Sequence, residues 1–105
     1  MGLYAVFRTR KVKPDKSIDD LTAAIREGFV PIVKAIPGFV EYSIVQNMET
    51  RDRTSVSIFA DKTGADESTK QAGDFLTGHG LADYYENVEP VIQEGTIIVF
   101  AAAGS

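Results

Sequence analysis

The 105-residue sequence predicts an α+β fold, with two helices on one face of a four-stranded antiparallel sheet. Apolar residues follow strand-like patterns in four segments and recur every three or four residues in two longer ones. Glycine, proline and short polar residues separate these six segments. The length suits one domain over residues 1–105, because independent domains mostly contain about 100–150 residues.

The composition excludes several classes of protein. The sequence has no cysteine, so it holds no disulfide, no thiolate metal site and no cysteine nucleophile. Its net charge of -4 disfavours general binding to nucleic acid or to an anionic membrane. The longest apolar run, 97–103, is too short to cross a bilayer as a helix, and the first residues do not resemble a signal peptide. We therefore expect a cytoplasmic protein without nucleic-acid or membrane partners.

The first strand and the first helix are expected in the first third of the sequence. Residues 3–10 alternate as a strand, with apolar side chains on both faces. Ser17 can cap a helix over about residues 18–36, in which Pro31 should introduce a kink because it lacks a backbone N–H. The following Pro37 should end this helix. Its apolar stripe consists of Ile18, Leu21, Ile25, Phe29, Ile32, Val33 and Ile36.

A hairpin and a second helix are expected next. Residues 39–46 and 54–61 have strand patterns, and the polar residues 47–52 between them suit the tip of a hairpin. Ser68 and Gln71 stand three residues apart, which is the spacing of a capping box at the start of a helix.

The remaining residues complete the fold. Residues 81–88 have the spacing of one more short helix, and Glu94 with Gly95 suggests a turn. The continuous apolar run over 96–102 is typical of a strand with both faces covered. The order strand, helix, strand, strand, helix, strand is that of the ferredoxin-like βαββαβ fold.

The sheet of such a fold has one face without helices. The strands predicted at 3–10 and 96–102 are apolar on both faces, so this open face needs cover. A homodimer that pairs through the two sheet faces is the economical arrangement. The alternative is a monomer with a mixed open face. The polar residues that would allow it are Glu41, Ser43, Ser55 and Ser57.

Several short stretches carry a resemblance to a known family: Glu27-Gly28-Phe29 with Pro31, Pro37-Gly38-Phe39 with Tyr42, and Val56-Ser57-Ile58-Phe59 with Asp61, Gly64-Ala65 and Glu67-Ser68. In these the chain resembles the dimeric α+β barrel superfamily, specifically small proteins related to the antibiotic biosynthesis monooxygenase-like domain. The resemblance implies two ferredoxin-like protomers that pack sheet against sheet, with their helices outside.

The resemblance also implies a function, a cofactor-independent monooxygenase that acts on a small aromatic phenol or quinol. The alternative is a non-catalytic dimeric module that binds a small ligand or has a role in the stress response. Haem-degrading relatives use an asparagine in the first strand and a tryptophan; the predicted first strand lacks asparagine and the chain lacks tryptophan. Related oxygenases place a tryptophan in the second helix where this chain has Phe75, which keeps a ring without an indole donor. We expect no cofactor and no metal.

Tyr42, His79 and Tyr4 are the candidate catalytic residues. A buried phenol can orient a phenolic substrate through a hydrogen bond, and a histidine is the usual base near neutral pH. Each has a structural alternative, because the tyrosines can be core aromatics and a histidine between two glycines can be a solvated residue at a helix end. A lone histidine disfavours a catalytic metal. The candidate substrate-binding residues are Phe29, Ile32, Phe39, Phe59 and Phe75.

A basic cluster occupies the first strand and the loop after it, in contrast to the acidic second half of the chain. It can recognise an anionic ligand or pair with an acidic helix of a partner, although most such clusters are solvated surface. Its members are Arg8, Arg10, Lys11, Lys13 and Lys16.

Overall fold

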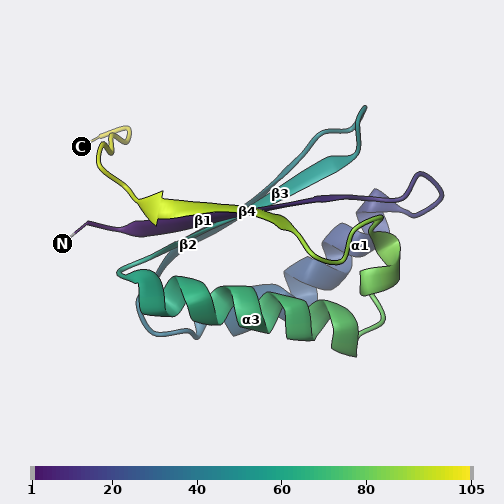
Figure 1. The fold of residues 1–105 in the computed structure, drawn as a ribbon, viewed down its shortest axis with the longest axis horizontal. Coiled ribbons are helices and arrows are strands. Elements are labelled where there is room, and N and C mark those ends of the chain that lie inside the picture. The colour runs from purple at the N-terminus through teal and green to yellow at the C-terminus, as the bar shows by residue number, and fades with distance from the viewer. Residues whose placement is uncertain (1, 105) are drawn as a thin grey trace.

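The computed structural model describes residues 2–104 and has the predicted order of strands and helices (Figure 1). A π-helical turn, η1, joins two short α-helices into one rod, and a 3-10 turn, η2, precedes the last strand. The elements are β1 (Tyr4–Lys11), α1 (Ile18–Ala24), η1 (Ile25–Phe29), α2 (Val30–Lys34), β2 (Phe39–Gln46), β3 (Asp52–Phe59), α3 (Lys62–Gly78), η2 (Ala82–Tyr84) and β4 (Val91–Thr96).

The four strands form one antiparallel sheet in the order β2-β3-β1-β4. Figure 1 shows the helices gathered on one side of this sheet, with the other face open. The core lies between the two layers, where Val6, Leu21, Phe29, Phe59 and Leu76 are buried. The structure therefore confirms the predicted α+β, ferredoxin-like fold.

The rod made of α1, η1 and α2 shows how the chain accommodates Pro31. Ser17 caps its start as predicted, with its Oγ accepting a hydrogen bond from the Asp20 N–H at 3.0 Å. The irregularity expected at Pro31 takes the form of a π-turn that ends at Phe29. Pro31 itself lies in the first turn of α2, directly after the π-turn, so the residue without a backbone N–H falls where the hydrogen bonding changes from π to α.

The second long helix begins six residues before the predicted Ser68 cap. Asp61 caps α3 instead, with its carboxylate accepting from the Gly64 N–H at 3.3 Å. Ser68 lies buried within the helix, and its Oγ donates to the carbonyl of Ala65 at 2.7 Å. The capping-box prediction was wrong because it considered Ser68 alone, whereas an aspartate directly after β3 was free to cap the helix earlier.

The last strand also begins earlier than predicted. Glu94 and Gly95 are not a turn but pair with Val6 and Ala5 of β1. The apolar residues after β4 lie outside the sheet, and Ile98, Val99 and Phe100 are 91%, 83% and 62% exposed. The strand predicted at 96–102 is therefore wrong, and the last strand is β4. Residues 98–100 do not form a strand with both faces covered, because within one chain their side chains are left exposed rather than packed between two layers. The short helix predicted over 81–88 is reduced to the single turn η2.

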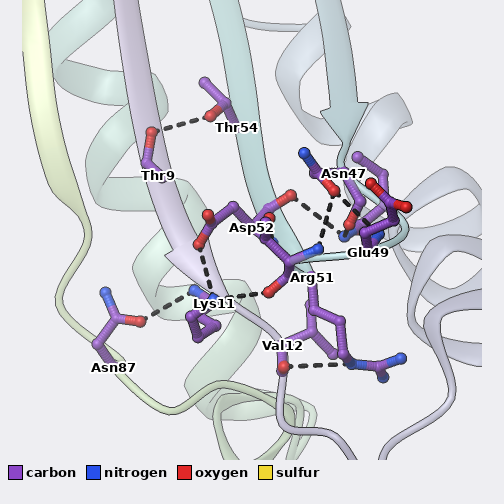
Figure 2. Close-up of polar contacts among 11 residues, drawn as sticks. Thr9, Lys11, Val12, Asn47, Glu49, Arg51, Asp52, Thr54 and Asn87 are labelled. Carbon is purple, nitrogen blue, oxygen red and sulfur yellow. Dashed lines mark hydrogen bonds and ion pairs between the residues drawn. The ribbon is translucent and has the colours of Figure 1, made fainter.

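The loop after β2 is fastened to the end of β1, as Figure 2 shows. The Val12 N–H donates to the carbonyl of Arg51 at 3.0 Å, and Lys11 pairs with Asp52 at 3.3 Å. Arg51 adopts a left-handed backbone conformation with φ of 68°. These contacts hold the start of β3 in register with β1. They also fix the position of Arg53, which lies on β3 two residues after Arg51.

No helix among residues 2–104 combines the length and the apolar character that a membrane crossing requires.

Candidate functional site

Two adjoining cavities lie between the sheet and the helices. The inner cavity has a volume of about 30 Å³, and the outer cavity, which is more open, has about 290 Å³. Ile25, Tyr42, Ile44 and Arg53 line both of them. The inner cavity reaches β1 and α3, and the outer cavity lies between β2 and the rod of α1 and η1.

Arg8 projects from β1 toward the helices and is 1% exposed. Alternation along the strand places it on the same face as Val6 and Arg10, which is the buried face of the sheet. Desolvation by burial lowers the pKa of Arg8 to about 10, so its guanidinium is still charged at neutral pH. The guanidinium donates hydrogen bonds to four hydroxyl groups, those of Ser55, Ser57, Ser68 and Thr69, at 2.7–3.2 Å.

Arg10 and Arg53 stand directly opposite each other on β1 and β3. They are 8% and 4% exposed. Arg10 donates from Nε to the carbonyl of Val88 at 2.8 Å, and its guanidinium lies over the ring of Tyr85, 5.5 Å from the ring centroid. Both side chains line the inner cavity beside Arg8.

Arg53 uses only part of its hydrogen-bonding capacity. Its Nε donates to Gln46 Oε1 at 2.6 Å and its Nη2 donates to Thr22 Oγ1 at 2.5 Å. Arg53 also interacts with Tyr85, where its charge and a side-chain hydrogen bond oppose the rise in the Tyr85 pKa that burial causes. The Arg53 Nη1 is buried and has no partner at normal hydrogen-bond geometry within residues 2–104. The protein therefore presents an unused, charged donor beside the cavities.

None of these three arginines forms an ion pair within the described chain. The ion pairs there join half-buried or exposed lysines to aspartates, at Lys11, Lys13, Lys16, Lys62 and Lys70. The carboxylate of Glu89 acts on Arg10 from a distance and raises its pKa slightly against the larger lowering by burial. The inner cavity is consequently a strongly positive site.

Tyr42 contributes a phenol to the wall that the two cavities share. Its ring meets Phe29 edge-on, with 5.6 Å between centroids. Burial raises the pKa of Tyr42 to about 12, although the guanidinium groups of Arg8, Arg53 and Arg10 lower it in part. The hydroxyl is therefore neutral at physiological pH and can donate a hydrogen bond. It has no hydrogen bond to any other residue in the described range.

The structure brings some of the predicted site residues together and separates others. Tyr42, Phe29 and Phe75 line the inner cavity. His79 lies at the end of α3, stacks on Phe75 with 4.2 Å between ring centroids, and lines neither cavity. Tyr4 donates to Glu94 Oε1 at 3.0 Å, also away from the cavities.

The three other predicted substrate-binding residues, Ile32, Phe39 and Phe59, belong to the packing of the core. Phe39 and Phe59 pack edge-on at 5.9 Å, and Phe59 is fully buried. Ile32 is partly buried against the same core. None of these three side chains lines either cavity.

Sequence reasoning missed Arg53 and Tyr85 at the site and assigned Arg8 and Arg10 to a basic cluster. A signal was present in β3, where Arg53, Ser55, Ser57 and Phe59 alternate on one face. Polar residues that share a strand face with a buried phenylalanine indicate a buried polar site. No group of three or more histidine, aspartate or glutamate residues suited to a metal occurs in the part of the chain that the structure describes.

No family model matches the sequence, and no curated protein is similar enough in sequence to count as a relative. Solved structures share the fold. A candidate antibiotic biosynthesis monooxygenase from Bordetella bronchiseptica is 15% identical, with a TM-score of 0.74 over 94% of this chain and 100% of that chain. A protein of unknown function from Nitrosomonas europaea is 18% identical, with a TM-score of 0.74 over 100% and 98%.

A variant of SnoaB, a cofactor-independent oxygenase from Streptomyces nogalater, is 9% identical, with a TM-score of 0.65 over 100% of both chains. At these identities the comparisons show a common fold. The predicted resemblance to antibiotic biosynthesis monooxygenase-like proteins is confirmed at that level.

Proposed function

We propose that the protein binds a small aromatic phenol or quinol beside Tyr42 and oxygenates it with O₂ without a cofactor. The observation that carries this proposal is the neutral, partly buried phenol of Tyr42 in the shared wall of two cavities, with Phe29 against its ring. The outer cavity, about 290 Å³, is of the size that a small ring system fills. The shared fold with a cofactor-independent oxygenase supports the proposal.

The chemistry draws on the substrate's own electrons. In an anthrone-type substrate, an ionised ring gives its electrons to O₂, a CH₂ carbon loses two hydrogens and becomes a carbonyl, and the second oxygen atom leaves as water. Tyr42 would donate a hydrogen bond to the substrate oxygen, and the guanidinium groups of Arg10 and Arg53 would favour the ionised form. The apolar walls formed by Ile25 and Ile44, which line both cavities, would hold the ring and limit the access of water.

A second candidate function is binding of the same ligand without turnover. One observation favours it: no histidine, aspartate or glutamate is among the side chains that line the two cavities. An enzyme at this site would therefore depend on a substrate acidic enough to lose its proton without a protein base.

We also propose that the protein acts as a homodimer through its open sheet face. Phe7 on β1, Val45 on β2 and Val91 on β4 are exposed there. The exposed apolar residues 98–100 continue from the edge strand β4. A second copy of the chain offers an equally apolar face, and pairing would cover both.

Oxygen consumption with a panel of anthrones and dihydroquinones tests the function. We expect uptake above the uncatalysed rate, reduced roughly tenfold or more in Tyr42→Phe because the substrate oxygen loses its donor. Tyr84→Phe is the matched control, since Tyr84 lines neither cavity, and it should react at the unchanged rate. Saturable binding of the panel without any uptake would reject the oxygenase and favour the binding module.

A further inference from the structure

The three guanidinium groups of the inner cavity are the least explained feature of the molecule. Burying a charge is costly unless an opposite charge or sufficient hydrogen bonds compensate. Arg8, Arg10 and Arg53 are all more than 90% buried, and none of them has an ion-pair partner within residues 2–104. Three positive charges thus gather in one wall without a counter-charge in contact.

The register of the sheet makes this arrangement more costly. Arg10 and Arg53 are direct cross-strand partners, and like charges in that relation are destabilising. Arg10 and Arg8 lie two positions apart on the same face of β1, and the charge of Arg10 further lowers the pKa of Arg8. A purely structural role would be served better by apolar residues of similar volume.

The hydrogen bonds show which of these groups are available to a ligand. Arg8 is held by four hydroxyl groups and serves as a fixed positive charge at the back of the site. Arg53 has a buried Nη1 with no partner at normal hydrogen-bond geometry in the described chain, and Arg53 lines both cavities. The hydroxyl of Tyr42, on the same shared wall, is a second available donor.

The sizes of the two cavities indicate the shape of the missing group. A water-sized group needs roughly 10–15 Å³ of cavity volume. The inner cavity, with about 30 Å³, therefore has room for about two such groups. This is the room required by the two oxygens of a carboxylate. The outer cavity, with about 290 Å³ and walls that include Ile25, Val30 and Ile44, can take an attached ring.

We propose that the inner cavity is an oxyanion subsite, and that the natural ligand is a small aromatic acid. Its anionic oxygens lie between Arg53 and Arg10, and its ring lies in the outer cavity. This inference rests on the proposed function because it concerns the ligand of the same site. It adds that this ligand carries a negative charge. Binding is therefore tested with a ligand that cannot be oxygenated, apart from the oxygen-uptake assay.

Isothermal titration with benzoate, benzamide and inorganic phosphate tests the subsite in low-chloride buffer. Benzoate and benzamide have nearly the same shape but differ in charge. We expect benzoate to bind roughly tenfold or more tightly than benzamide, because a charge-assisted hydrogen bond is about twice as strong as a neutral one. Phosphate should bind more weakly than benzoate because it leaves the outer cavity empty.

Arg53→Gln should remove most of the preference for benzoate, because it deletes the unpartnered Nη1 together with its charge. Lys34→Gln removes one positive charge from an exposed residue of α2 that lines neither cavity, and should bind benzoate as the parent protein does. If Arg53→Gln does not fold, the arginine Nε–H signals of the unaltered protein provide the test. Benzoate should shift a buried arginine signal, and benzamide should not.

Equal affinity for benzoate and benzamide would overturn the inference, and so would phosphate binding as tightly as benzoate. Selective binding of benzoate without oxygen uptake by any phenol would support the subsite while rejecting the oxygenase. Uptake of oxygen with neutral phenols, together with no preference for benzoate, would support the oxygenase and reject the subsite.

Discussion

At the scale of single residues, the molecule depends on polar side chains placed where an apolar core is expected. Arg8 on β1 is fully buried, and its hydrogen bonds reach one neighbouring strand and one helix, through Ser57 on β3 and Ser68 on α3. The planar guanidinium can make these contacts at once because its donors point in fixed, separate directions. Arg8 thereby connects the sheet to α3.

Arg8→Lys tests this role. Lysine keeps the positive charge but has a single nitrogen, so at least part of the set formed by Ser55, Ser57, Ser68 and Thr69 loses its donor. We expect the free energy of unfolding in urea to fall by about 2 kcal/mol. Arg26→Lys, at an exposed position of η1, should change it by less than about 0.5 kcal/mol. Equal stability of the two variants would show that the hydroxyl contacts of Arg8 contribute little.

At the scale of elements, the π-turn η1 and the helix α3 pack closely because Gly28 has no side chain. A Cβ at Gly28 would lie 2.6 Å from Cζ of Phe75, well inside van der Waals contact. Phe75 also lies 5.7 Å from Phe29, centroid to centroid, and both rings line the inner cavity. The shape of the cavity therefore depends on this helix contact.

A pair of glycine substitutions separates packing from helix propensity. Gly28→Ala should lower the free energy of unfolding by about 1–3 kcal/mol, because the Phe75 ring has to move within a packed core. Gly73→Ala is the matched control, since an added Cβ there meets no atom within 4 Å. That substitution should stabilise α3 by up to about 1 kcal/mol. Thermal or urea unfolding measures both, and destabilisation by Gly73→Ala would contradict this account.

At the scale of the whole molecule, the apolar surface is unevenly distributed. The helices cover one face of the sheet (Figure 1). The other face and residues 98–100 beyond β4 expose large apolar side chains. Exposed apolar surface of this kind is typical of a protein interface. It is the physical basis for the homodimer proposed above.

Light scattering during gel filtration tests the assembly. We expect a mass of twice 11.4 kDa at micromolar concentration. Phe7→Asp places a charge in the middle of the open face and should shift the mass toward that of one chain. Val88→Asp adds the same charge at an exposed residue between η2 and β4 and should leave the dimer intact. A mass of one chain for the unaltered protein would reject the dimer.

Much of the fold could be predicted because its signals are local. The alternation in β1 and β2, the Ser17 cap and the stripe that includes Phe29 all depend on residues close together in the sequence. The predictions that were wrong concerned places where two nearby residues or segments could take the same structural role. Asp61 caps α3 ahead of Ser68, and the strand begins at Val91 rather than at residue 96, because only pairing with β1 decides which residues are used.

The candidate site was predictable only in part. The sequence by itself determined the order of the elements, the face of β2 that carries Tyr42, and the presence of arginines on β1. Only the tertiary structure decided that Arg53 stands opposite Arg10 and beside Tyr42, and that His79 stays outside the cavities. The physical reason is that side-chain periodicity is a local property, whereas the neighbours of a buried charge are set by strand register and helix packing.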